Sequence, residues 1–121
     1  MKIQSYRDLK VWQSSMDLVE LVYKMTRSFP TSEKFGLMSQ MQRAAVSIPS
    51  NIAEGAGRNH TKEYLHHLAM AYGSLMELET QIQIAVRLKY LTKQEVIEAW
   101  TIASETGQML NKLMVVLKAK L

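Results

Sequence analysis

Apolar residues recur along the whole chain at spacings of three and four, the period of an α-helix, and no segment alternates as a strand would. The first helix is predicted over roughly residues 6–28, with Ser5 as its N-cap and Asp8 in its first turn. Pro30 should end it, because the residue before a proline avoids the helical region. Its main apolar stripe is Leu9, Trp12, Met16, Val19 and Tyr23, and the residues that widen this stripe are Leu18, Val22, Met25 and Phe29.

Three further helices are predicted. The second should start after Thr31 or Ser32 and fade near residues 55–57, and the third should run from Thr61 to about Tyr90. The fourth opens at Thr92 with "TKQE", a capping box in which each side chain bonds the other residue's backbone N–H. The apolar stripes are Leu37, Met41, Ala44, Ile48 and Ile52 in the second helix, Leu68, Ala71, Leu75, Leu78, Ile82 and Ala85 in the third, and Val96, Trp100, Ala103, Gly107, Leu110, Met114 and Leu117 in the fourth.

Four long helices joined by short turns predict an all-α fold, an antiparallel up-and-down four-helix bundle that forms a single domain over residues 1–121. The hydrophobic share of 47% is enough for a core, yet no apolar run approaches the roughly 20 residues of a membrane helix. The N-terminus lacks the apolar core of a signal peptide. There is no cysteine, which excludes disulfides and thiolate chemistry. We therefore expect a soluble cytoplasmic protein with no membrane partner.

Several helices are apolar over more than one face. Outside its main stripe, the fourth helix also carries Ile97, Ile102, Met109, Leu113 and Val116. A monomeric bundle needs only about three apolar positions in seven, and a surplus that nothing covers would be a sticky patch. Self-association into a homo-oligomer is the preferred interpretation. The alternative is a wide core with scattered exposed apolar residues, which is common in soluble proteins.

The stretch "SIPSNIAEGAGRNH", residues 47–60, combines helical spacing with residues that usually interrupt helices. We expect a helix kinked at Pro49, whose ring opposes a carbonyl one turn earlier, and a glycine-rich end that either terminates the helix or lets another approach. Glu79 borders the apolar stripe of the third helix and needs a partner, with Arg43 or Arg58 as candidates. A structural polar network is predicted from Arg43, Ser47, Asn51, Glu54, Arg58 and Glu79. A polar ligand-binding cleft is the alternative.

The net charge of +4 is modest, but basic residues gather near both ends of the sequence. Such ends suit a polyanion, and the candidate nucleic-acid-binding residues are Lys2, Arg7, Lys10, Arg58, Lys62, Lys112, Lys118 and Lys120. No RNA-reading motif and no helix-turn-helix signature occurs, so binding of RNA or DNA is expected to be directed to the backbone. The alternative is a protein-interaction scaffold whose partner is a polymerase or another protein encoded nearby.

Catalysis and metal binding are not expected. The segment "EYLH", residues 63–66, has the Glu-x-x-His spacing of di-iron bundles, but such a site needs two of these pairs and further carboxylates. The three histidines, His60, His66 and His67, are interpreted as a solvated helix end. No catalytic triad, phosphate-binding loop or dinucleotide motif is present, so we predict no enzyme and no cofactor.

Three segments resemble one family: "DLKVWQ" (residues 8–13), "FGLMSQMQRAAVSIPSNIAEGAGR" (35–58) and "GSLMELETQIQIAVRLKYL" (73–91), followed by "GQMLNKLMVVLK" (107–118). They are similar to the four-helix-bundle proteins of the 23S ribosomal RNA intervening-sequence family. The resemblance implies an antiparallel bundle and ring-like homopentamers. A related branch, the accessory protein of diversity-generating retroelements, is a basic pentamer that binds a reverse transcriptase and nucleic acid. The positions that carry the family's motif here are Arg43, Ser47, Pro49, Asn51, Glu54, Gly55, Arg58, Glu77 and Glu79, and the mild basicity of this chain departs from the retroelement branch.

Overall fold

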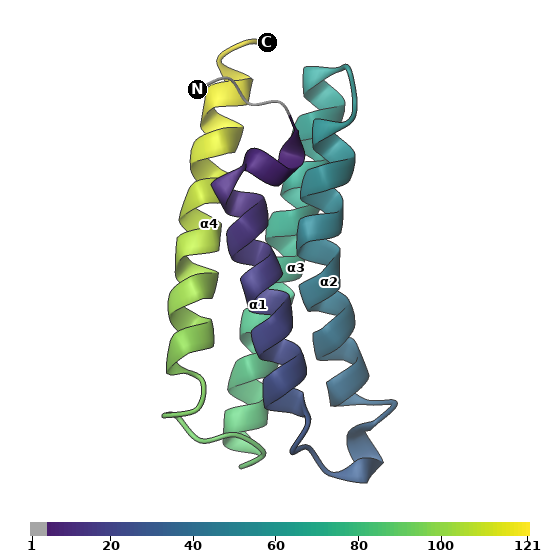
Figure 1. The fold of residues 1–121 in the computed structure, drawn as a ribbon, viewed down its shortest axis with the longest axis vertical. Helices are drawn as coiled ribbons and strands as arrows, with labels where there is room; N and C mark the ends of the chain where they lie inside the picture. The colour runs from purple at the N-terminus through teal and green to yellow at the C-terminus, as the bar shows by residue number, and fades with distance from the viewer. Residues whose placement is uncertain (1–4) are drawn as a thin grey trace.

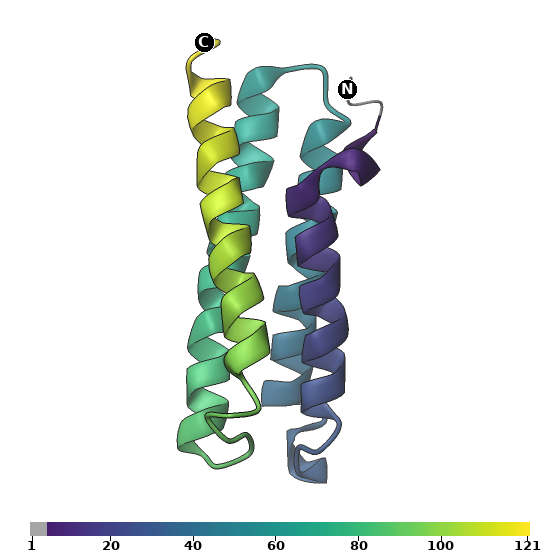
Figure 2. The same ribbon diagram turned by 60° about the vertical axis from the view of Figure 1, so that its left-hand side comes forward.

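The computed structural model describes residues 5–121, and four long helices account for most of them. They are α1 (Lys10–Thr26), α2 (Leu37–Ala56), α3 (Thr61–Arg87) and α4 (Ile97–Lys118), with short 3-10 helices η1 (Tyr6–Asp8) and η2 (Thr31–Glu33). Successive helices run in opposite directions (Figures 1 and 2), and α1 and α3 each pack against both α2 and α4. The described residues contain no strand. The predicted all-α four-helix bundle is confirmed.

The helix α1 turns a different face to the core from the one predicted. The residues of α1 that are buried are Val11, Ser15, Leu18, Val22 and Thr26. Met16 and Tyr23, from the predicted main stripe, are 39% and 43% exposed. The prediction failed because two buried residues are polar, and their hydroxyls are satisfied within the helix: Ser15 donates to the carbonyl of Trp12 at 2.7 Å and Thr26 to that of Val22 at 2.9 Å.

The helix α2 begins at Leu37, later than the predicted start after Thr31 or Ser32. Thr31–Glu33 form the single turn η2, and the Glu33 carboxylate accepts a hydrogen bond from the Leu37 N–H at 2.9 Å. The Tyr90 hydroxyl donates to the other oxygen of the same carboxylate at 2.8 Å. These two bonds lower the pKa of Glu33, and the bond to Glu33 raises the pKa of Tyr90. Glu33 therefore starts α2 and ties it to the end of α3.

The stripes of α3 and α4 agree closely with the prediction. All six predicted core residues of α3 are buried, and so are Ala103, Gly107, Leu110 and Leu117 of α4. A Cβ on Gly107 would lie 3.3 Å from Cδ2 of Leu75, so the absence of a side chain there brings α4 close to α3. The other three predicted residues of the α4 stripe are half-buried.

The boundaries of α3 and α4 differ in detail from the prediction. His60, not Thr61, takes the N-cap position of α3, and the helix ends at Arg87, before Lys89 adopts a positive φ of 64°. The two hydrogen bonds of the predicted capping box are present: the Thr92 N–H donates to Glu95 at 2.8 Å, and the Glu95 N–H donates to the Thr92 hydroxyl at 3.1 Å. They close a turn that precedes α4, however, and the predicted start of the fourth helix at Thr92 is wrong, because α4 begins at Ile97. Within residues 5–121, no helix is both long and apolar enough to cross a membrane.

Candidate functional site

A chain of polar side chains joins α2 to α3 near the middle of the bundle. The Asn51 amide donates to the backbone carbonyl of Ser47 at 2.9 Å and to the Ser47 hydroxyl at 3.1 Å. Its carbonyl oxygen lies 3.1 Å from Nδ1 of His67 on α3. The Ser47 hydroxyl lies 2.8 Å from that of Ser74, also on α3. Two polar contacts between α2 and α3 are therefore linked through one asparagine.

The outer end of this network reaches solvent. Glu54 accepts a hydrogen bond from Arg58 at 3.1 Å and lies 4.0 Å from Nε2 of His67. The side chains of Arg58 and Glu54 are 47% and 55% exposed, whereas that of His67 is only 13% exposed. An exposed pair one helical turn apart contributes about 0.3–0.5 kcal/mol at most. The half-buried part around Asn51 therefore carries most of the network's stabilising effect.

The structure joins four of the six residues predicted for the polar network. Ser47, Asn51, Glu54 and Arg58 are connected as described. Arg43 is exposed on α2 and forms no ion pair or hydrogen bond with the described residues. Glu79 is half-buried on α3 and likewise forms no ion pair or hydrogen bond with them. Glu79 lies beside a surface hollow of about 350 Å³ that Arg87 also lines, and burial raises the pKa of its carboxyl. Helical spacing along α2 shows which residues share its face, but it does not show which residues of α3 lie opposite.

His67 is the member of the network that the sequence interpretation missed. His60 and His66 are exposed, as expected of a solvated helix end, but His67 faces α2. Its spacing of seven from Ser74 places both residues on one face of α3, and this was the available signal. No group of three or more His, Asp or Glu side chains that could hold a metal ion occurs in residues 5–121.

Gly55 explains how His67 comes so near to α2. A Cβ on Gly55 would lie 2.8 Å from the Cβ of His67 and 3.0 Å from Cδ1 of Tyr64. The helix α2 passes through Pro49 and Gly55 and ends at Ala56, with Gly57 as its C-cap. Of the two roles expected for the glycine-rich segment, close approach therefore belongs to Gly55 and termination to Gly57.

Seven of the eight candidate nucleic-acid-binding residues gather at one end of the bundle. The alternating helix directions bring together residues 5–10, 54–66 and 108–121, which we call the basic end (Figure 1). These segments hold seven of the 15 Lys and Arg residues and three of the 11 Asp and Glu residues, a net charge of +4. The other described residues include seven basic and eight acidic residues, a net charge of −1. The charge asymmetry of the folded chain is thus greater than its total charge suggests.

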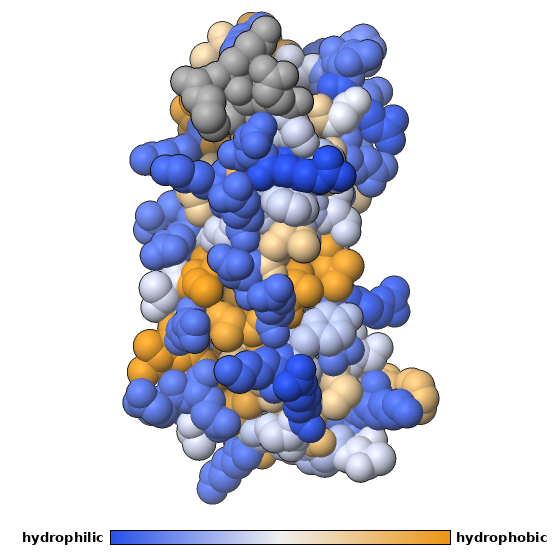
Figure 3. All heavy atoms as spheres, in the orientation of Figure 1, coloured by the Kyte–Doolittle hydropathy of each residue, from blue (hydrophilic) through white to orange (hydrophobic). Residues whose placement is uncertain are grey.

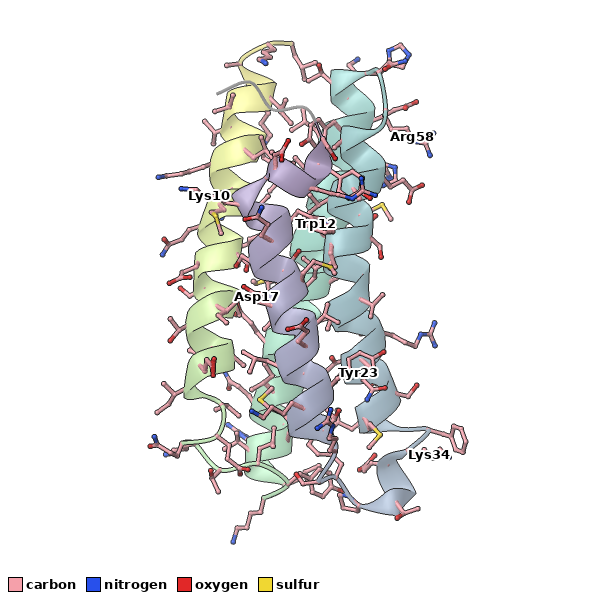
Figure 4. All side chains as sticks on the ribbon, viewed as in Figure 1. Lys10, Trp12, Asp17, Tyr23, Lys34 and Arg58 are labelled. Carbon is pink, nitrogen blue, oxygen red and sulfur yellow. The ribbon has the colours of Figure 1, made fainter. Side chains whose placement is uncertain are left out.

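The candidate residues at the basic end are exposed to solvent. The described ones are Arg7, Lys10, Arg58, Lys62, Lys112, Lys118 and Lys120, and Lys2 lies outside the described residues. Figure 4 shows Lys10 and Arg58 at this end and Lys34 at the opposite end. Arg58 is paired with Glu54, and Arg7 lies over the ring of Tyr6, 5.1 Å from its centre. The five lysines form no ion pair within residues 5–121, so their charges are available to an external anion.

An apolar groove lies between α1 and α2, and we call it the α1–α2 groove. It has a volume of about 370 Å³. It is lined by Tyr6, Trp12, Met16, Val19, Val46, Pro49, Ser50 and Ala53, and no charged residue of the described part lines it. Trp12 and Tyr23 lie on the α2 side of α1 (Figure 4), and apolar side chains gather across the middle of the face that α4, α1 and α2 form (Figure 3). Three residues of the predicted main stripe of the first helix, Trp12, Met16 and Val19, therefore line a surface groove.

The fold and these surfaces define a class: an all-α four-helix bundle with one basic end and an uncharged apolar groove. The sequence model for the 23S rRNA-intervening sequence protein family matches residues 7–112. The chain therefore belongs to the 23S rRNA-intervening sequence protein family, which confirms the resemblance seen in its motifs.

A solved structure has the same fold. It is a crystal structure of a protein with unknown function from the S23 ribosomal protein family of Bacteroides thetaiotaomicron VPI-5482, with a TM-score of 0.77 and 20% sequence identity. The similarity covers 86% of this chain and 97% of the other. No curated protein matches this chain in sequence. At this level of identity, the likeness concerns the fold alone.

Proposed function

We propose that this protein is a non-enzymatic homo-oligomer that binds the backbone of RNA or DNA through its basic end. The observation that carries the proposal is the charge of that end, +4, whereas the other described residues sum to −1. The lysines there come from both termini and from the α2–α3 connection, and they are exposed and without ion pairs in the described part. A phosphate backbone is the polyanion that such a cluster of mobile point charges suits.

The mode of binding follows from the side chains available. Lysine contacts a phosphate as a point charge and reads no base edge, so the affinity should vary little with sequence. Each phosphate that the protein neutralises releases condensed counterions. The logarithm of the binding constant should therefore fall by about 0.9 per contact for each tenfold rise in salt on duplex DNA.

Self-association through the α1–α2 groove completes the proposal. A second copy of the chain suits this groove because its described lining is uncharged and mostly apolar, with Met16 39% exposed in it, and Tyr23 extends the exposed apolar surface beside it. The resemblance noted in the sequence implies five copies, which at +4 each would carry +20, five times the charge of one chain. An assembly multiplies weak contacts with a long polyanion through avidity.

The oligomer and the nucleic-acid binding can be tested separately. Light scattering on the intact protein measures the mass, and Met16→Glu should lower it by placing charges in the α1–α2 groove. Met70→Glu is the matched control, since Met70 is 44% exposed on α3, away from the groove. Equal masses for wild type and Met16→Glu, or equal loss in both variants, would remove the groove from the interface.

The binding test uses fluorescence anisotropy of labelled structured RNA and duplex DNA over a series of salt concentrations. The proposal predicts micromolar or tighter binding near physiological salt, with a steep salt slope and similar affinities for unrelated sequences of one polymer. No binding to either polymer near physiological salt would contradict it.

The second candidate is an accessory scaffold that binds a protein partner, such as a reverse transcriptase, and has no affinity of its own for nucleic acid. The exposed apolar residues favour it, because Ile97, Val115 and Val116 of α4 are each more than half exposed. Binding of a partner that persists at high salt, together with a failed anisotropy test, would distinguish this role from the first.

A further inference from the structure

A second groove lies between the last turns of α3 and the first turns of α4, at the end opposite the basic end, and we call it the α3–α4 groove. It has a volume of about 460 Å³. Its floor and most of its walls are apolar: Ile82 is buried, Val86, Val96 and Trp100 are half-buried, and Ile97 is 54% exposed. The uncharged polar residues of the lining are Gln83 and Thr101. Volumes of about 300–1,000 Å³ with apolar walls are typical of sites for small molecules.

The rim of the α3–α4 groove is cationic. Arg87, the last residue of α3, and Lys93, in the turn before α4, both line it. Both are exposed, neither forms an ion pair in residues 5–121, and no acidic residue of this part lines the groove. The acidic group nearest along α3 is Glu79, which shares the neighbouring hollow with Arg87 without pairing with it.

The frame of this groove is held by hydrogen bonds. The reciprocal capping box of Thr92 and Glu95 fixes the turn that carries Lys93. The Thr101 hydroxyl donates to the carbonyl of Ile97 at 3.0 Å, so the polar group on the α4 wall is already satisfied. A groove that is formed before binding loses little conformational entropy when a ligand enters.

We propose that the α3–α4 groove binds a small amphipathic anion, a molecule with one aromatic or branched aliphatic body and a single carboxylate. The body lies against Trp100 and the valine and isoleucine walls, and the carboxylate lies between Arg87 and Lys93. The α1–α2 groove differs in the feature that decides this assignment, because its described lining includes no charged group. This proposal does not depend on nucleic-acid binding, which uses the other end of the bundle.

The test uses 4-phenylbutyrate as the probe and 4-phenyl-1-butanol as its uncharged counterpart. Binding to the assembled protein is followed by the NMR signals of the two indole N–H groups, which Trp12→Phe assigns. The acid should shift the Trp100 signal saturably, with one molecule per chain, and leave the Trp12 signal in place. The alcohol should bind more weakly. The absence of a saturable shift of the Trp100 signal would overturn the proposal. The same result is expected if a second copy of the chain covers the groove.

Variants separate the two parts of the site. The double variant Arg87→Gln with Lys93→Gln should lower the affinity for 4-phenylbutyrate about fivefold, because each of the two exposed cations contributes only a small factor to the affinity. The acid should then bind no more tightly than the alcohol. Ile97→Asp should abolish binding of 4-phenylbutyrate, since it removes an apolar wall and adds a negative charge beside the carboxylate. The variant should still fold, because an aspartate in the first turn of α4 favours the helix. Lys24→Gln with Lys34→Gln is the control of equal charge. Equal affinities for acid and alcohol, or equal weakening in the control, would contradict the proposal.

Discussion

Replacing Asn51 by alanine tests whether the polar network between α2 and α3 stabilises the fold. The asparagine donates to the Ser47 carbonyl and hydroxyl at 2.9 and 3.1 Å, and it contacts His67 at 3.1 Å. Alanine removes all three contacts and leaves the His67 ring, whose side chain is 13% exposed, without its hydrogen-bond partner at Nδ1. The contact between Ser47 and Ser74 remains.

The size of the effect follows from the two groups that lose partners. A hydrogen bond contributes about 0.5–1.5 kcal/mol net, so the loss of the amide donor and the His67 contact should cost about 2 kcal/mol. Alanine has a higher helix propensity than asparagine, which offsets about 0.6 kcal/mol of this loss. The free energy of unfolding should therefore fall by about 1.5 kcal/mol.

The assay is urea unfolding followed by circular dichroism, at one protein concentration for all variants because assembly links stability to concentration. Thr80→Ala is the control, since the exposed Thr80 hydroxyl bonds the Met76 carbonyl of its own helix at 2.9 Å and Thr80 does not line the α1–α2 groove. The loss of this hydroxyl should cost less than about 0.5 kcal/mol. If the free energy of unfolding of Asn51→Ala lies within about 0.5 kcal/mol of the wild-type value, the contacts of Asn51 do not stabilise the fold.

Three further predictions concern stability. Gly55→Ala should lower the free energy of unfolding by about 1–2 kcal/mol, because the new Cβ would meet side chains of α3. Gly73→Ala should raise it by up to about 1 kcal/mol, because a Cβ there meets nothing within 4 Å and alanine favours the helix. Urea unfolding of both variants measures the difference. Glu54→Ala should lower the free energy of unfolding by no more than about 0.5 kcal/mol in the same assay, because the ion pair of Glu54 with Arg58 is exposed. The pKa of Glu33 is lowered in the folded protein, so its stabilising effect is complete above the ordinary glutamate pKa of about 4.3 and is lost as the pH falls through the lower folded value. Tyr90→Phe should therefore lower the melting temperature at pH 7, and the gap to wild type should narrow in acid; a constant gap would contradict this account.

Much of the fold could be predicted because strong local signals agree with packing. The stripe of α3 contains only apolar residues at spacings of three and four, and the "TKQE" motif forms the reciprocal hydrogen bonds that it predicts, in the turn before α4. In α1, two apolar stripes compete, and buried Ser15 and Thr26 disguise the one that faces the core. Hydropathy alone cannot identify a hydroxyl that bonds to its own helix, and so the predicted face was wrong.

The polar sites show the same limit. Residues on one face of α2 could be grouped from their spacing, but the partner of Asn51 on α3 depends on the relative height of two helices, and Gly55 sets their distance. That is why His67 was missed and Glu79 was assigned to the network. The basic end could be anticipated in part, because an up-and-down bundle must bring its two termini and the α2–α3 connection together. The cationic rim of the α3–α4 groove could not be anticipated, since Arg87 ends α3 and Lys93 lies in the turn before α4.

The salt dependence of duplex DNA binding, compared between two variants of equal charge, shows whether the basic end holds the nucleic acid. One replaces Lys112, Lys118 and Lys120 at the basic end with glutamine, and the other replaces Lys24, Lys34 and Lys89, three exposed lysines outside that end, with glutamine. The account predicts that the first variant loses up to about 2.7 units of the salt slope, about 0.9 for each of three phosphate contacts, while the second retains the wild-type slope. Equal slopes in the two variants would show that the basic end does not hold the nucleic acid.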